Sequence, residues 1–198
     1  NGAERIVVSQ FVRSPGVYFR KKTTPIPDRI HYIATIIPNR GAWLEVETDK
    51  DYLILANINK MKKLPVTTLL GALGFTEEQV LDRVKNNELF QPTLDKYPIL
   101  PQDECLLDIH RKLRPGDPVT IDGARALFQG LFFDEGKYDL GEVGRYRLNQ
   151  RLGLSVDSKN VVLTEDDIFA VVNGMLDLIQ GKEITDDIDH LGNRRIKS

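Results

Sequence analysis

The stretch from Ile30 to Ile58, IHYIATIIPNRGAWLEVETDKDYLILANI, decides the fold class of this chain. In Ile30–Ile37 the apolar side chains of one face recur at every second position, which is the period of a β-strand. Asn39–Gly41 is a hairpin-turn signal, and an alternating segment follows it. Asp49–Asp51 then turns the chain into the apolar run Tyr52–Ile58. The whole stretch predicts an antiparallel meander.

The residues before this stretch extend the same pattern. Arg5–Val12 (RIVVSQFV) is β-branched and apolar, and a turn signal at Ser14–Gly16 closes it, so we expect a buried strand. Val17–Phe19 indicates a second strand, and Pro25 and Pro27 punctuate the loop after it. The first sixty or so residues are therefore predicted to be mostly antiparallel sheet.

After residue 64 the apolar spacing becomes helical. Thr76–Gln79 is a capping box, Thr164 caps the longest predicted helix, and Gly74 stops a short one. Glu88–Pro101 contains three prolines and is predicted to be an irregular crossing. The predicted helices are Thr67–Leu73, Thr76 to about Lys85, Asp103–Leu113, one beginning after Thr120, one reaching Leu152, and Thr164 to about Gln180.

These elements predict an α+β fold. The N-terminal strands, residues 1–64, form an antiparallel β-rich base, which the C-terminal stretch 184–198 rejoins. Within that stretch Arg195–Lys197 is expected to return as an edge strand. Residues 65–183 are predicted to form a mainly helical subdomain inserted into the base.

Composition limits the classes of function. The 198 residues are 41% hydrophobic and 28% charged, which is ordinary for a globular protein. A formal net charge of -2 gives no overall attraction to nucleic acid or membrane, so any such binding must come from local patches. A single cysteine excludes an intramolecular disulfide framework. No run approaches membrane-spanning length, and because the chain starts with a strand close behind Asn1 we expect a piece of a longer polypeptide.

The most polar stretch is Asp186–Arg195 (DDIDHLGNRR). A core cannot bury so many polar groups unpaired, so the stretch suits a metal loop, a turn tied by internal ion pairs, or a ligand site. A calcium loop beginning at Asp187 needs ligands at its fifth and twelfth positions, where Leu191 and Ser198 stand. The spacing argues against a metal and leaves the turn and the ligand site open.

An active site contained within the chain has no specific motif behind it. Cys105 and His110 lie on one predicted helix about 140° apart, so they do not face each other as a nucleophile and its base would. Cys105 is instead typical of a small packed side chain. Phosphate-binding glycine loops, serine elbows and histidine-rich metal signatures do not occur in the sequence.

Basic side chains gather in several places, and each group taken singly is typical of a solvated surface. The groups are Arg20–Lys22, Lys60 with Lys62 and Lys63, His110–Lys112 with Arg114, Arg145 with Arg147 and Arg151, and Arg194 with Arg195 and Lys197. Trp43 is the only tryptophan and stands beside a turn. It suits either a core plug or an exposed platform on which an unpaired base stacks.

Six long blocks, in order, resemble the bacterial-type RNA polymerase β subunit, in the lobe that forms one jaw of its DNA channel. The matches cover essentially the whole chain. The blocks are Asn1–Arg5 with VVSQ and Arg13–Phe19, Ile36–Pro38 with Arg40–Leu44, Lys62–Pro65, Leu113–Pro118, Tyr138–Leu140 with Val143–Arg145, and Asp186–Ile196.

The resemblance implies a base pocket made by Arg13, Ile188, Asp189 and Arg194. In the family, these positions hold a flipped guanine of the non-template strand. The chemistry agrees, because a carboxylate accepts from guanine N–H groups and an arginine donates to O6 or phosphate. Residues 13 and 194 stand at opposite ends of the sequence, so the two chain ends must meet.

Further site residues are implied in the same way. Trp43 would stack on the neighbouring unpaired base, and Lys60 and Lys62 would face the non-template strand. Met61 departs from the family's basic tract and weakens that last assignment. A second set of positions lies at one margin of the rifamycin pocket, most of which lies beyond Ser198. That set is Arg5, Val8 and Gln10.

The implied role is non-catalytic within DNA-directed RNA polymerase, a nucleotidyltransferase. The fragment is expected to be inactive alone and to need no cofactor, because the β′ subunit holds the catalytic magnesium. The implied partners are downstream duplex and non-template DNA, the α, β′ and ω subunits, sigma factor and regulators on the lobe surface, with no membrane. The location would be cytoplasmic and nucleoid-associated, or plastid. The alternative is a protein-docking module whose arginines serve only internal ion pairs.

Overall fold

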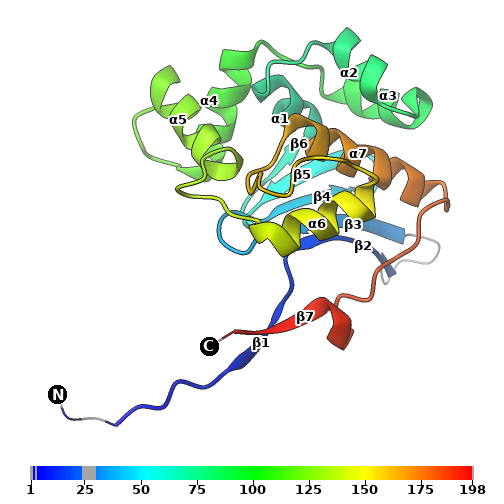
Figure 1. The fold of residues 1–198 in the computed structure, drawn as a ribbon. Helices are drawn as coiled ribbons and strands as arrows, with labels where there is room; N and C mark the ends of the chain where they lie inside the picture. Colours follow the sequence, from blue (N-terminus) through cyan, green and yellow to red (C-terminus); the bar gives the residue numbers. More distant parts are fainter. Residues whose placement is uncertain (1, 3, 24–29, 198) are drawn as a thin grey trace.

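The computed structural model describes residues 2, 4–23 and 30–197; the loop predicted around Pro25 and Pro27 lies outside them. Its centre is a five-stranded antiparallel sheet in the order β2-β3-β4-β5-β6, as the meander predicted (Figure 1). The strands are β2 (Gly16–Thr23), β3 (Ile30–Ile37), β4 (Leu44–Thr48), β5 (Ile54–Ile58) and β6 (Lys63–Pro65).

Period-two alternation places one face of the sheet in the core. Tyr32, Ala34 and Ile36 of β3 are buried, and the strand end at Ile30 is exposed. β2 and β3 pair along their full length, from Gly16 opposite Ile37 to Thr23 opposite Ile30. β-branched side chains fit such a pleated, half-buried surface, which is why the apolar pattern identified these strands.

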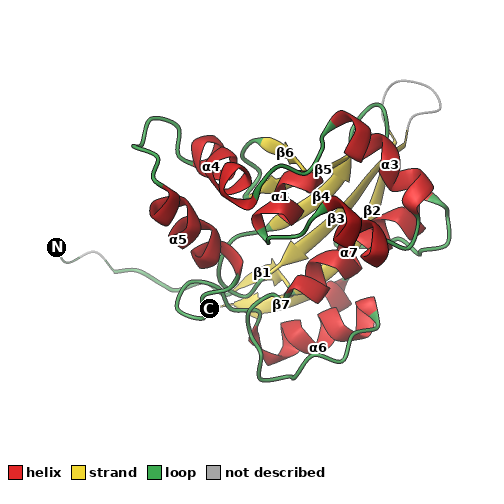
Figure 2. Ribbon diagram, turned by 90° about the horizontal axis from the view of Figure 1, so that it is seen from above, coloured by secondary structure: helices red, strands yellow, loops and turns green. Residues whose placement is uncertain are grey.

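The described residues form seven α-helices and one short 3-10 helix. α6 and α7 lie across one face of the sheet, where α6 packs on β2 and α7 on β2, β3 and β4 (Figures 1 and 2). α1 packs beside β5 and β6, followed outward by α4 and α5. The helices are α1 (Val66–Ala72), α2 (Glu77–Arg83), α3 (Asn87–Lys96), α4 (Gln102–Leu113), α5 (Ile121–Phe132), α6 (Gly141–Leu152) and α7 (Glu165–Ile179), with η1 (Leu191–Asn193) near the C-terminus.

The fold is α+β, as predicted. One hydrophobic cluster runs from the sheet through the helices, joining for example Ile36 and Leu44 to Phe128 and Met175. The helical part therefore shares its core with the strands. The proposed boundary between residues 64 and 65 stays a prediction.

Two capping boxes begin helices as the sequence indicated. The Thr76 side chain accepts from the backbone N–H of Gln79, and the Gln79 side chain accepts from Thr76 in return. Thr164 and Asp167 make the same reciprocal pair at the start of α7. Such caps satisfy backbone N–H groups that the first helical turn leaves without partners.

The prediction of an irregular crossing over Glu88–Pro101 is wrong for its first part, which belongs to α3. The Asn86 side chain caps this helix, and Phe90 and Leu94 are buried. Pro92 lies inside the helix but on its exposed side, where water can satisfy the carbonyl that loses its N–H donor. Burial of the apolar face therefore outweighs the proline.

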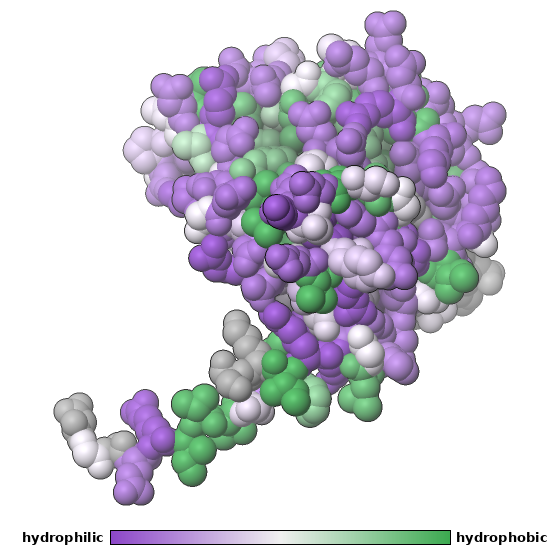
Figure 3. Space-filling model, in the orientation of Figure 1, coloured by the Kyte–Doolittle hydropathy of each residue, from purple (hydrophilic) through white to green (hydrophobic). Residues whose placement is uncertain are grey.

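The prediction that Arg5–Val12 is a buried strand is also wrong for this chain. Strand β1 covers only Gln10–Arg13, and it pairs with β7 (Arg194–Lys197) in a separate two-stranded sheet. Ile6 is 90% exposed and Val7 81%, and Figure 3 shows this arm as an apolar extension from a mostly polar surface. Ile6 and Val7 precede the ribbon, and no layer among the described residues covers them.

Arg145 corrects the interpretation of its basic cluster as surface. Its side chain is fully buried, and its Nη1 donates to both carboxylate oxygens of Asp167 at 2.7 and 2.9 Å. The remaining guanidinium nitrogens donate to the backbone carbonyls of Asn160, at 2.8 Å, and Val162. This arginine ties α6 to the beginning of α7 and is not available to an external ligand.

Candidate nucleic-acid interface

The two ends of the described chain meet in the β1–β7 ribbon, as expected (Figure 1). Arg13 stands directly opposite Arg194 in the antiparallel register. The next contact along the chain is the N–H of Ser14, which donates to the carbonyl of Asn193 at 2.9 Å. Two arginines from opposite ends of the sequence are thereby fixed on neighbouring strands.

The loop between α7 and β7 is shaped by its own polar groups. The Asp187 carboxylate accepts from the N–H of Asp189 at 3.0 Å, and the His190 Nδ1 accepts from the N–H of Gly192 at 3.1 Å. The Asn193 side chain donates to the carbonyl of Asp187 at 2.6 Å. These three interactions confirm the turn that the sequence left open, and they leave the Asp189 side chain directed elsewhere.

Asp189 and Arg194 form a surface ion pair across the end of this loop. The Arg194 Nη2 donates to Asp189 Oδ1 at 2.6 Å, and the two side chains are 35% and 66% exposed respectively. Exposed pairs contribute only about 0–1 kcal/mol, so a ligand can replace such a pair at little cost. A carboxylate and a guanidinium side by side offer an acceptor and donors to one planar polar group.

Ile188 has a different environment from its neighbour Asp189. It is 5% exposed and packs with Tyr18 and Ile37, and Trp43 lies against the same small cluster. Ile188 therefore links the loop to the apolar cluster against which Trp43 packs. This contact brings Trp43, far away in sequence, to the loop that leads into β7.

Trp43 is half-buried, so part of its side chain packs on the protein and part remains exposed. Its backbone is fixed by Asn59, whose Oδ1 accepts from the Trp43 N–H at 2.8 Å and whose own N–H donates to the Trp43 carbonyl at 3.0 Å. The Nζ of Lys60 lies 5.2 Å from the ring centroid, a cation–π distance. Trp43, Asn59 and Lys60 line a small open cavity of about 260 Å³.

The other predicted residues are more dispersed. Lys62 is exposed just before β6, beyond the Lys60 turn. Arg5 and Val8 are exposed on the N-terminal arm, and Gln10 stands in β1 opposite Lys197. The structure thus brings Arg13 and Asp189 to Arg194, and it joins buried Ile188 to Trp43, over which Lys60 lies. The rifamycin-margin residues lie along the arm.

Residues behind this surface were missed by sequence reasoning. Arg147 donates to the carbonyl of Gly192 and to the side chain of Asn193, and Arg151 pairs with Glu183 and Asp186. The two arginines stand one helical turn apart, which puts them on one face of α6. That spacing was the only signal available, and it does not name the partners.

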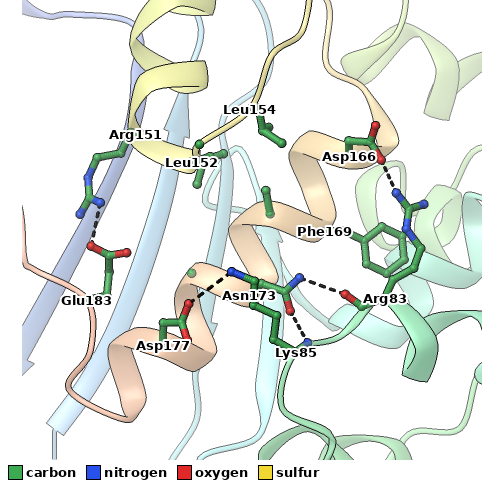
Figure 4. A pocket seen from close by; sticks show the side chains of 13 residues that line it. Arg83, Lys85, Arg151, Leu152, Leu154, Asp166, Phe169, Asn173, Asp177 and Glu183 are labelled. Atoms are coloured by element: carbon green, nitrogen blue, oxygen red, sulfur yellow. Dashed lines mark hydrogen bonds and ion pairs between the residues drawn. The ribbon is translucent and has the colours of Figure 1, made fainter.

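A second hollow, between α2, α6 and α7, is less suited to a ligand (Figure 4). Its volume is about 410 Å³, but its charged groups already pair with one another. Arg83 pairs with Asp166, and Lys85 Nζ lies 3.8 Å from Asp177. The Asn173 amide is likewise used on the backbone of Arg83 and Lys85.

Neither a cluster of metal-ligating side chains nor a membrane-spanning helix occurs in the described part of the chain. No three histidine, cysteine or acidic side chains there converge closely enough to hold a metal ion. None of the helices described has the length and apolarity that crossing a bilayer requires.

Comparison with known families agrees with the resemblance found in the sequence. The model of the family described as RNA polymerase Rpb2, domain 2, matches residues 13–197, and the chain belongs to this family.

Among curated relatives, the chain is similar to proteins named DNA-directed RNA polymerase subunit beta. The protein of Synechococcus elongatus is 46% identical over 201 residues, covering 100% of this chain and 18% of that protein. The Synechocystis sp. protein is 47% identical over 198 residues, with the same coverage. The Gloeobacter violaceus protein is 46% identical over 198 residues. The chain thus spans about 18% of the length of these relatives.

Proposed function

We propose that this chain is the lobe of an RNA polymerase β subunit and that it contacts downstream duplex DNA and the non-template strand of the transcription bubble. The observation that carries the proposal is the register of Arg13 opposite Arg194, beside the exposed Asp189–Arg194 pair. This arrangement joins a carboxylate and two guanidinium groups from distant parts of the sequence on one surface. Their combination suits a single unpaired base and its phosphate.

The base that fits best is guanine. Its Watson–Crick edge presents two N–H donors, which one carboxylate can accept together, and its O6 accepts from an arginine. Asp189 is the carboxylate, and Arg194 or Arg13 is the donor. The base would exchange the weak Asp189–Arg194 pair for two charge-assisted contacts.

Trp43 supplies a stacking surface next to this pocket. A base stacked on an aromatic ring contributes about 1–3 kcal/mol, whichever of the four bases it is. Lys60, which lies over the ring, would then move to the phosphate of the same nucleotide. Lys62 would extend the cationic track by one phosphate.

In this proposal the lobe holds DNA and takes no chemical part in nucleotidyl transfer. The β′ subunit would supply the catalytic magnesium, and the α, β′ and ω subunits with sigma factor would complete the enzyme. Arg5, Val8 and Gln10 would touch only the margin of a rifamycin pocket. The setting would be the cytoplasm and nucleoid, or a plastid.

The test is Asp189→Ala in the assembled polymerase, with open complexes formed on templates that carry each of the four bases at the pocket position. Wild-type complexes should live longest with guanine, and the variant should lose that preference. Glu78→Ala, an exposed carboxylate on α2, is the control and should keep it. Equal losses for all four bases would contradict the base pocket.

The alternative, a protein-docking module, is favoured by a separate observation. Val143 and Tyr146 are each 64% exposed and stand three residues apart on α6, so together they form a small apolar patch. If docking were the main role, Tyr146→Ala would weaken factor-dependent transcription and Asp189→Ala would leave open complexes unchanged. The reverse result would support the DNA-binding role.

A further inference from the structure

Helix α6 presents two arginines to the loop that carries Ile188 and Asp189. Arg147 and Arg151 stand on one face of the helix, and the loop between α7 and β7 crosses that face. The hydrogen bonds of the two arginines fall at opposite ends of the loop. Among the described residues, neither guanidinium hydrogen-bonds to a residue of the proposed base pocket.

Arg151 fixes the start of the loop. Its Nη1 donates to Glu183 at 2.7 Å, its Nη2 to the carbonyl of Ile184 at 2.6 Å, and its Nε to Asp186 at 3.2 Å. Burial alone would lower the pKa of Arg151, but the hydrogen bonds that it donates to Glu183 and Asp186, together with their charges, outweigh burial and raise the pKa. The guanidinium also lies 4.8 Å from the ring centroid of Phe19. All of its donor nitrogens are therefore used on this anchor.

Asp186 connects Arg151 to the sheet, because it also bonds to the backbone of Phe19 in β2. Its Oδ2 accepts from the N–H of Phe19 at 2.7 Å, and its own N–H donates to the Phe19 carbonyl at 2.7 Å. The loop thus begins bonded to the edge strand β2. Ile188 follows two residues later, which limits how far it can move from Tyr18 and Ile37.

Arg147 fixes the end of the loop. Its Nη2 donates to the Gly192 carbonyl at 3.2 Å and to Asn193 Oδ1 at 2.5 Å. The Asn193 side-chain amide in turn donates to the carbonyl of Asp187, and the Asn193 backbone carbonyl accepts from the N–H of Ser14. A single guanidinium therefore joins α6 to a side chain that spans the loop and leads directly into Arg194.

We propose that Arg147 is a positioning residue of the base pocket, with Arg151 as the second anchor. This inference rests on the proposed function. Held at both ends, the loop presents Asp189 at a fixed place beside Arg194 before any base arrives. Preorganisation of this kind raises affinity by removing the ordering cost from the binding step.

The two anchors differ in what their loss would do. Arg151 joins three groups and covers Phe19 of the core, so its removal should also destabilise the fold. The Arg147 guanidinium hydrogen-bonds only to the loop end, and the part of Arg147 that lies nearest β2 is its Cβ, which alanine keeps. Its truncation should therefore loosen the pocket while the body remains folded. Arg147 is therefore the residue to test.

The experiment uses assembled polymerase that carries Arg147→Ala, Arg147→Lys, Asp189→Ala, or Arg147→Ala with Asp189→Ala. Lifetimes of open complexes are compared with guanine and with each other base at the pocket position. Arg147→Ala should lower the guanine preference about threefold to tenfold, which lies in the lower part of the range expected for coupled residues in one network. Arg147→Lys, which keeps a donor, should fall between the wild type and Arg147→Ala.

The double variant separates positioning from a general structural role. If Arg147 acts through Asp189, adding Arg147→Ala to Asp189→Ala should cause no further change in base preference. Glu142→Ala, which removes an exposed side chain of α6, is the matched control and should leave the preference intact.

The outcomes also separate this inference from the proposed function. If Asp189→Ala keeps the guanine preference, the base pocket itself is wrong. If Asp189→Ala abolishes the preference while Arg147→Ala keeps it, the pocket stands and the positioning role is overturned. Equal loss of lifetime with all four bases in Arg147→Ala would also overturn it. Should Arg147→Ala fail to assemble, Arg147→Lys carries the same comparison.

Discussion

Gly174 of α7 lies against the ring of Phe19 of β2 so closely that a Cβ at position 174 would stand 2.6 Å from Phe19 Cζ. The ring is fully buried beneath the helix. No real Cβ contact is this short, so either the ring or the helix must shift if the glycine is replaced. The missing side chain therefore sets the distance between α7 and the sheet.

Gly174→Ala should destabilise the chain by about 1–3 kcal/mol, the usual cost of overpacking a core. Urea unfolding followed by circular dichroism measures the change. Gly130→Ala in α5 is the matched control, because its Cβ would meet only the flexible end of Lys137 at 3.0 Å. That control should be neutral or stabilising by up to about 1 kcal/mol, since alanine is the better helix former. Equal destabilisation by both substitutions would contradict the packing argument.

Arg145→Met should destabilise the fold far more than surface substitutions do. It leaves the Asp167 carboxylate buried without its partner, which costs about 3–5 kcal/mol. The combined Arg145→Met and Asp167→Leu variant should recover part of that loss, because no buried charge is then stranded. Arg125→Met, which removes a half-exposed arginine paired with Asp103, should change stability by no more than about 1 kcal/mol.

Tyr138→Phe should stabilise the chain and reduce its sensitivity to alkali. The Tyr138 hydroxyl is buried without a hydrogen-bond partner among the described residues, and an unsatisfied buried group costs about 1–3 kcal/mol. Tyr18→Phe is the contrasting variant, because the Tyr18 hydroxyl donates to the Ser14 carbonyl at 2.7 Å. That variant should lose about 1 kcal/mol.

The pH dependence follows from the same burial. Burial and then the Asp167 carboxylate raise the pKa of Tyr138, which the Arg145 charge only partly opposes. The unfolded chain therefore releases this proton first, at a pKa of about 10. Below that pH the ionisation of Tyr138 does not change the free energy of unfolding. As pH rises above it, that free energy falls, because only the unfolded chain ionises readily. Urea midpoints between pH 8 and 11 should fall more steeply for the wild type than for Tyr138→Phe.

Lys60→Gln should lower the salt dependence of DNA binding by the polymerase in open complexes, where the strand beside Trp43 would be unpaired. Each phosphate contact contributes about 0.7 to the slope of log affinity against log salt. Lys50→Gln is the matched control, because Lys50 stands at the far end of β4 from Trp43. The measurement is a salt titration of polymerase open complexes. A slope unchanged by Lys60→Gln would remove Lys60 from the DNA track.

Local signals predicted most of the fold. The strands from Gly16 to Ile58 follow from alternation and turns, and the helix beginnings follow from Thr76, Thr120 and Thr164. Tertiary contacts decided the failures. Pro92 is accommodated because burial of the opposite face of α3 outweighs it, and the apolar arm before β1 stays exposed because periodicity does not say what covers a strand.

The candidate site was less accessible to sequence reasoning. The residues alone left two roles open for Trp43, a core plug or an exposed stacking platform. In the structure its side chain is half-buried and packs against the small apolar cluster that contains Ile188. Arg145, Arg147 and Arg151 have different environments, although all three belong to one basic cluster on α6. Whether an arginine is buried, anchors a loop or faces solvent depends on carboxylates and carbonyls far away in the chain, which no local pattern records.

The pairing of Arg13 with Arg194 gives the molecule a narrow neck. The Cα atoms of paired antiparallel residues lie about 4.5–5.5 Å apart, so the segment between them leaves and returns at a single point. A tight turn is enough to bridge such a gap. The described residues from Ser14 to Asn193 thus begin and end at one place, which the β1–β7 ribbon holds together.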